Sequence, residues 1–131
     1  MLQIDFYITK ETAPQFALRT ACRIAEKAHQ AGYKVHLLTN NDGDTQALDT
    51  LLWTFRDRSF IPHEIFSSAK TTCSVTISVE NSPVKTEILI NISHKIPENL
   101  EHFQRIAEII DNHTESIDAG RKRYRFYREQ G

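Results

Sequence analysis

Glycine is scarce in this sequence, and its spacing excludes the loops that hold phosphate groups. The 131 residues include four glycines, at positions 32, 43, 120 and 131. Loops such as G-x-G-x-x-G and G-x-x-x-x-G-K-[ST] need closely spaced glycines, because their backbone must approach the phosphate closely. Neither pattern occurs. We therefore expect no nucleotide-binding loop and no cofactor.

Recognisable arrangements of catalytic or metal-binding residues are also missing. Cys22 and Cys73 stand far apart, which is typical of free thiols in a reducing compartment and not of a disulfide or zinc framework. The six histidines show no metal-ligand spacing, and no serine lies in a G-x-S-x-G turn. Cys22 falls among alanines, where we expect a small buried side chain. The sequence predicts neither a metal site nor a catalytic site.

Long hydrophobic runs are absent. No stretch approaches the ~20 apolar residues of a membrane helix, and residues 1–5 lack the basic start of a signal peptide. Sixteen Lys and Arg residues nearly balance seventeen Asp and Glu, giving a net charge of −1, which argues against general binding to polyanions. We expect a cytoplasmic protein with no membrane partner, folded as one domain over residues 1–131.

The apolar residues that are present follow the periods of strands and helices in alternation. Leu2, Ile4, Phe6 and Ile8 alternate with more polar residues, as in a strand. An alanine-rich helix should follow up to Gly32, then a strand at residues 34–39 parallel to the first. We expect Asp44 to cap a second helix, and residues 73–79 and 88–92 to form later strands. This order predicts an α/β three-layer sandwich with a mixed, partly parallel sheet.

The segment from residue 97 to residue 111 fits two patterns. Leu100, Phe103, Ile106 and Ile110 fit one face of a helix, whereas residues 103–110 fit a strand equally well. Periodicity leaves both open. A terminal helix is expected to begin at Thr114.

Two surface features stand out. Trp53 points away from the apolar stripe of its helix, and Phe60, Ile61 and Pro62 add apolar bulk after that helix ends. This patch fits either a loop that covers the core or an anchor for another protein, since exposed aromatic residues often dominate interfaces.

The second feature is the basic, tyrosine-rich terminal helix. Residues 119–131 carry five basic residues and one acidic residue, net +4, whereas the remaining chain carries eleven and sixteen, net −5. One side of this helix is expected to hold Ile117, Gly120, Tyr124 and Tyr127, with Arg121, Arg125 and Arg128 beside it and Lys122 and Arg123 elsewhere. The pattern fits either a tyrosine stripe packed on the sheet below a solvated basic face, or an anion-binding surface. Like charges at Arg121 and Arg125 repel, which favours an anion.

Several blocks of this sequence resemble the chi subunit family of bacterial DNA polymerase III. They are DFYI at 5–8, Leu52-Trp53 followed by SFIPH at 59–63, ILINI at 88–92 and RYRFYR at 123–128. The resemblance implies a Rossmann-like fold that binds no nucleotide and has a strand at 106–110. It also implies a noncatalytic, replisome-associated subunit that joins the psi subunit and the acidic C-terminal tail of single-stranded DNA-binding protein, and so meets DNA only indirectly.

Carried onto this chain, the family's tail pocket maps to Arg121 and Tyr124, with Ile110 and Ile117 as an apolar wall. Arg125 and Arg128 are expected to attract acidic residues of the tail. The resemblance places the psi interface at Trp53, Phe60, Ile61 and Pro62. The alternative function is direct binding of single-stranded nucleic acid, with Tyr124 and Tyr127 as stacking platforms.

Overall fold

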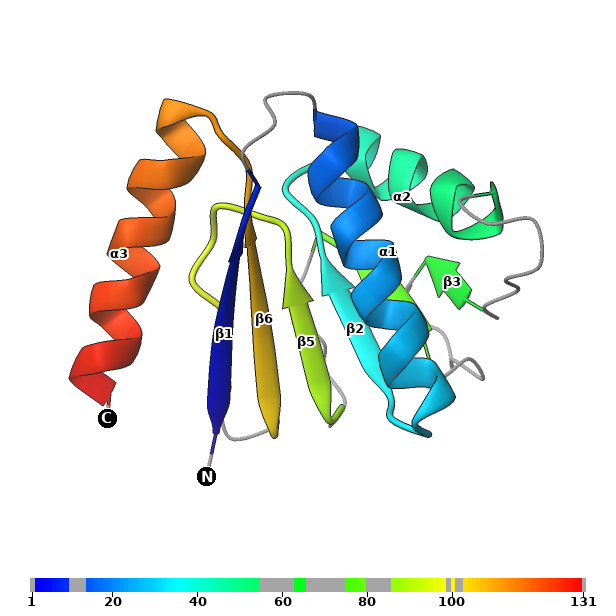
Figure 1. The fold of residues 1–131 in the computed structure, drawn as a ribbon, viewed down its shortest axis with the longest axis horizontal. Coiled ribbons are helices and arrows are strands. Elements are labelled where there is room, and N and C mark those ends of the chain that lie inside the picture. Colours follow the sequence, from blue (N-terminus) through cyan, green and yellow to red (C-terminus); the bar gives the residue numbers. More distant parts are fainter. Residues whose placement is uncertain are drawn as a thin grey trace.

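The computed structural model is an α/β protein in which helices flank one sheet (Figure 1). It describes residues 2–9, 14–54, 63–65, 75–79, 86–98, 100 and 103–130. In chain order the elements in these residues are β1 (Gln3–Ile8), α1 (Pro14–Gln30), β2 (Val35–Leu38), α2 (Asp42–Thr54), β3 (His63–Ile65), β4 (Val75–Ser78), β5 (Ile88–Asn91), β6 (Arg105–Ile110) and α3 (Thr114–Gln130).

The six described strands form one sheet in the order β1-β6-β5-β2-β4-β3, and each neighbouring pair is parallel. The expected mixed sheet is therefore wrong. The strand order explains the difference, because β2 lies between β4 and β5 and pairs in parallel with both.

The helices cover both faces of the sheet, so the expected three-layer arrangement is confirmed. On one face, α1 and α2 bury a large apolar core in which the α1 alanines lie close to the strands. On the other face, α3 packs beside β1 and β6 around a smaller core containing Leu89, Ile106 and Tyr127. The central strands β2, β4 and β5 are buried on both sides, as parallel strands usually are.

Local signals explain where the elements begin and end. Gly32 adopts a φ of 88° just after α1, as expected for a glycine that ends a helix. The predicted cap at Asp44 is wrong, because the side chain of Asn41 accepts a hydrogen bond from the Asp44 backbone N–H at 2.8 Å and caps α2 instead.

Cys22 is fully buried in α1, where desolvation raises its pKa to about 12, so its thiol stays protonated. Cys73 lies outside the described residues.

The ambiguous segment contains strand β6, as the family resemblance implies. Ala107 and Ile109 face the core under α1, whereas Ile106 faces the core under α3. Because β6 is a central strand, residues on both of its faces are buried, and this produces an apolar run with no clear alternation in the sequence.

A buried polar cluster attaches α3 to the sheet. Glu108 in β6 is 0% exposed and Arg123 in α3 is 1% exposed, and the Arg123 Nε donates to Glu108 Oε1 at 2.8 Å. The Tyr127 hydroxyl and the Asn91 side-chain amide both donate to the other carboxylate oxygen. Burial raises the pKa of Glu108 above its ordinary value, and the charge of Arg123 together with these donors offsets part of that rise. We expect the pair to be ionised, because a guanidinium keeps its charge and a neutral Glu108 would leave it unpaired.

Replacing Arg123 tests this attachment. Arg123→Met leaves Glu108 buried without its cation, so we expect the free energy of unfolding to fall by about 3–5 kcal/mol. Lys122→Met is the matched control, because Lys122 is the exposed neighbour on the same helix, and should change stability by no more than about 0.5 kcal/mol. Urea unfolding measures both variants, and equal losses would contradict the proposed role of the pair.

Candidate functional site

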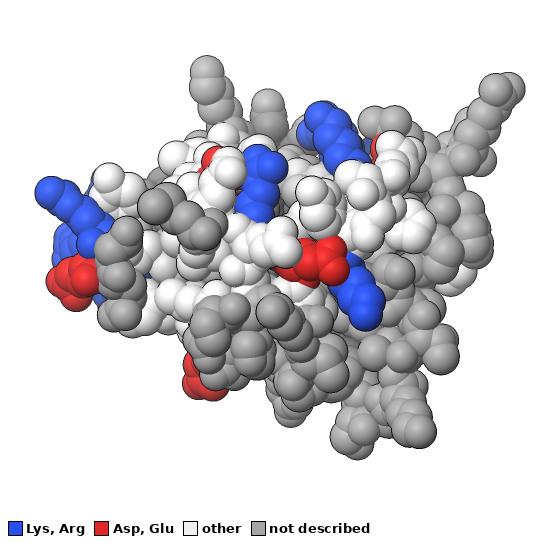
Figure 2. Space-filling model, turned by 90° about the horizontal axis from the view of Figure 1, so that it is seen from below, with Lys and Arg blue, Asp and Glu red and all other residues white. Residues whose placement is uncertain are grey.

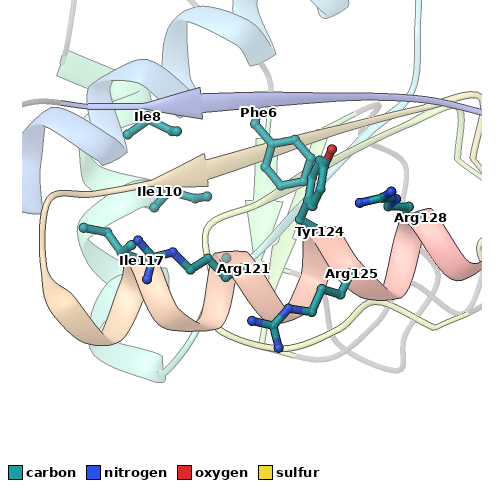
Figure 3. Close-up of a pocket in the computed structure, with 9 residues that line it drawn as sticks. Phe6, Ile8, Ile110, Ile117, Arg121, Tyr124, Arg125 and Arg128 are labelled. Atoms are coloured by element: carbon teal, nitrogen blue, oxygen red, sulfur yellow. The ribbon is translucent and has the colours of Figure 1, made fainter.

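A pocket of about 600 Å³ lies between α3 and the β1–β6 pair (Figure 3). The residues that line it are Phe6, Ile8, Ile110, Ile117, Gly120, Arg121, Tyr124, Arg125 and Arg128. At one end of the pocket the helix and the sheet come very close. A Cβ added at Gly120 would lie 2.5 Å from the Ile110 Cδ1, so glycine allows the helix to approach β6 here.

The inner part of the pocket is apolar. Ile110 is buried at its base, and Ile8 is its register partner on β1 and is 68% exposed. Tyr124 and Phe6 meet edge to face with ring centroids 5.6 Å apart, and in Figure 3 they lie between the isoleucines and Arg128. Tyr124 is 53% exposed, although it is a large aromatic residue. The result is an open slot with aliphatic and aromatic walls, which suits an apolar group small enough to fit between them.

Three arginines of α3 complete the pocket, and its described lining includes no acidic side chain. Arg121, Arg125 and Arg128 are all exposed. The guanidinium of Arg121 lies 3.8 Å from Asp118, and both side chains are mostly solvated, so this ion pair contributes little and leaves Arg121 able to bind an anion. Figure 2 shows basic side chains, with an acidic group beside them, at the left edge of the molecule, the side on which α3 lies in Figure 1.

All six residues that the family resemblance assigned to tail binding line this cavity: Ile110, Ile117, Arg121, Tyr124, Arg125 and Arg128. Their binding role stays a prediction. Sequence reasoning missed Phe6, Ile8 and Gly120 as lining residues. Their signal was the alternation that puts Phe6 and Ile8 on one face of β1, but β1 and α3 are too far apart in sequence for that pattern to bring them together.

Tyr127 does not share the environment of Tyr124. It is buried and donates its hydroxyl to Glu108, and burial together with that carboxylate raises its pKa. The two tyrosines that we expected on one side of the helix therefore differ, because Tyr127 is buried and Tyr124 is half exposed. Arg123 points away from the pocket, as expected, but into the protein and not into solvent. A stacking surface for nucleic acid built on both tyrosines is not available.

The second predicted surface is described only in part. Trp53, near the end of α2, is 47% exposed. Phe60, Ile61 and Pro62 lie outside the described residues. Across the described part of the chain, no group of three His, Cys, Asp or Glu residues could hold a metal ion, and no helix is long and apolar enough to cross a membrane.

The contact between Gly120 and Ile110 gives a test of the pocket's geometry. Gly120→Ala should force the Ile110 side chain to move, at a cost that offsets the roughly 1 kcal/mol gained from the better helix former. Ile110→Val removes the Cδ1 atom that the new methyl group would meet. We therefore expect Gly120→Ala to be better tolerated by about 0.5–1.5 kcal/mol in the Ile110→Val background, measured by a double-mutant unfolding cycle. Additive effects would contradict the contact.

Comparison with known proteins agrees with these observations. The chain matches the family described as DNA polymerase III chi subunit, HolC, over residues 1–131. It is 34% identical over 132 residues to "DNA polymerase III subunit chi" of Pseudomonas aeruginosa, which covers 100% of this chain and 92% of the relative. It is 24% identical over 130 residues to the protein of the same name from Haemophilus influenzae, covering 97% and 90%. The chain therefore belongs to the DNA polymerase III chi subunit family and is a noncatalytic accessory subunit of the replicative polymerase.

Proposed function

We propose that the pocket between α3 and β1 holds the acidic C-terminal tail of single-stranded DNA-binding protein, and that a second surface joins psi and so the clamp loader. The observation that carries the proposal is the combination of an open apolar slot with three exposed arginines beside it. A tail that ends in phenylalanine offers the matching groups: an aromatic ring, a terminal carboxylate and acidic residues before them.

The energetics of this arrangement suit a transient complex. Burying the terminal ring against Ile110, Ile117 and Tyr124 contributes about 1.5–3 kcal/mol. A charge-assisted hydrogen bond from Arg121 to the terminal carboxylate contributes about 1.5–3 kcal/mol more. After the cost of association, with Arg125 and Arg128 attracting the acidic residues, we expect a micromolar complex of about −8 kcal/mol that salt weakens.

A peptide tail fits the site better than naked single-stranded DNA does. Binding of single strands uses a basic groove with several open aromatic platforms. Here Tyr127 is buried, and the charge of Arg123 is neutralised inside the protein by Glu108. The pocket of about 600 Å³ has room for an aromatic ring and its neighbouring residues, and the net charge of the residues outside the terminal helix is negative.

The psi surface is proposed at Trp53 and the residues that follow α2. An exposed tryptophan on a helix is a common anchor in protein interfaces. In Figure 1, α2 lies over the half of the sheet that contains β3, whereas α3 lies beside β1 at the opposite edge. Two partners bound at these places would not compete for the same surface, which supports a bridging role at the replication fork.

A peptide titration tests the tail proposal. A fluorescent tail peptide that is acidic and ends in phenylalanine should bind with micromolar affinity, and Arg121→Ala should cost about 1.5–3 kcal/mol of binding free energy. Lys122→Ala is the matched control, because Lys122 is exposed on the same helix but does not line the pocket. It should change the affinity only slightly.

Two outcomes would contradict this proposal. A peptide without its terminal phenylalanine should bind more weakly by about 1.5–3 kcal/mol, so equal binding would show that the apolar slot is not used. Tighter binding of naked single-stranded DNA than of the peptide, with the same dependence on Arg121, would favour the nucleic-acid alternative.

The psi surface is tested separately. Trp53→Ala should reduce co-purification with psi, because an interface anchor typically carries at least about 2 kcal/mol of binding energy. Peptide binding should stay at the wild-type value, since α3 is not altered. Loss of both activities would point to misfolding, and unchanged psi binding would remove Trp53 from the interface.

A further inference from the structure

The outer edge of β1 is the feature that extends the proposed site. The strand order gives β1 one hydrogen-bonded neighbour, β6, among the described residues. We propose that the tail segment before the terminal residue adds to this edge as an extended strand parallel to β1. This inference rests on the proposed function and specifies how the same site would hold the tail's backbone.

The hydrogen-bond pattern of β1 identifies which backbone groups face outward. The Gln3 N–H donates to Gln104 O at 3.1 Å, and the Thr9 N–H donates to Ile110 O at 2.9 Å. Backbone groups alternate in direction along a strand of a parallel pair, so the odd-numbered residues of β1 face β6. The N–H and C=O groups of Phe6 and Ile8 therefore point away from the sheet, toward its open edge.

The same two residues line the pocket with their side chains. A ligand seated against the side chains of Phe6 and Ile8 is thus next to a backbone edge that can accept another strand. Edge strands of this kind bind extended peptides in many proteins, where main-chain hydrogen bonds provide affinity and side-chain pockets provide specificity.

The positions of the arginines favour a parallel orientation. Gly120 packs against Ile110, which pairs with Ile8, and Tyr124 packs against Phe6, so α3 runs in the direction opposite to β1. A terminal carboxylate at Arg121 therefore lies near the end of β1, and the preceding residues run back toward its start. This makes the peptide parallel to β1, like every pair in the described sheet.

The charge spacing also matches an extended chain. Along the axis of α3, Arg125 and Arg128 lie about 6 Å and about 10.5 Å beyond Arg121. These distances correspond to about two and about three residues of a strand. Acidic residues just before the end of the tail would therefore pass these two arginines in turn.

The acidic residue of β1 does not oppose an acidic strand. Asp5 is held by Arg105, with Arg105 Nη2 2.6 Å and Nε 2.7 Å from Asp5 Oδ2. Its charge is therefore balanced within the sheet. Glu108 in the neighbouring strand is buried and paired with Arg123. The exposed charges that line the pocket are all positive.

A backbone scan of the peptide tests strand addition. Each synthetic peptide keeps the terminal phenylalanine and carries one N-methyl group at a different upstream residue. Since every second N–H of an added strand faces β1, methylation should weaken binding by about tenfold at alternate positions and by less than about twofold at the intervening ones. Side chains stay unchanged throughout, so the intervening positions are internal controls. An affinity that does not alternate overturns strand addition.

Amide hydrogen exchange by NMR gives a second measurement on the full-length protein. Saturating peptide should slow the exchange of the Phe6 and Ile8 amides by at least about tenfold. The amides of Asp5 and Tyr7 already face β6 and serve as controls. Unchanged exchange at Phe6 and Ile8 overturns the inference, and so does protection that rises with protein concentration without peptide, because that would assign the edge to a second copy of this chain.

The two proposals fail differently. If binding depends on the terminal phenylalanine and on Arg121 but shows neither alternation nor edge protection, the tail uses the pocket without pairing to β1, and strand addition alone is wrong. If binding depends on neither group, both proposals are wrong.

Discussion

The buried contact between Glu108 and Arg123 is the constraint on which the candidate site depends. An ion pair in the interior loses its hydration and needs further hydrogen bonds to compensate. Here Tyr127 and Asn91 also donate to the Glu108 carboxylate. These hydrogen bonds and the one from Arg123 can form together only at one rotation of α3 about its axis and one position along β6. That rotation turns Arg121, Tyr124 and Arg128 outward into the pocket. The inner face of the helix therefore determines what its outer face presents.

Gly120 adds the second constraint, because it sets how closely α3 approaches the sheet. The helix touches Ile110 at this point and is attached again by Arg123 and Tyr127 further along. Along the same stretch of α3, the side chains that point outward leave space beside β1, and this space is the pocket. The pocket is thus a product of packing on both sides of it, and it needs no conformational change to form.

The sequence predicted individual elements better than it predicted their neighbours. The alternation in β1, the glycine after α1 and the start of α3 at Thr114 are local signals, and the structure confirms each of them. The strand order is not a local property, which is why the mixed sheet was wrong. The strand β6 needed the family resemblance, because a strand buried on both faces lacks a period. The lining residues of the candidate site could be predicted where they all belong to one helix, but not where two elements meet. The charge count, for example, included Arg123 in the basic helix, although Glu108 neutralises it inside the protein. One signal did exist, since Glu108 stands within an apolar run and an acidic residue in a buried strand needs a cationic partner.

The arrangement of the sheet bears on whether the two proposed surfaces can influence each other. Trp53 lies on α2, and the pocket lies beside α3; these two helices are on opposite faces of the sheet and toward opposite edges. The parallel strands between them pack against fully buried residues of α1. The described contacts give one arrangement of this core, and coupling between sites requires an element with two states. A chi subunit built in this way would hold both partners at once with independent affinities. It would then raise the local concentration of single-stranded DNA-binding protein at the clamp loader through the linkage alone.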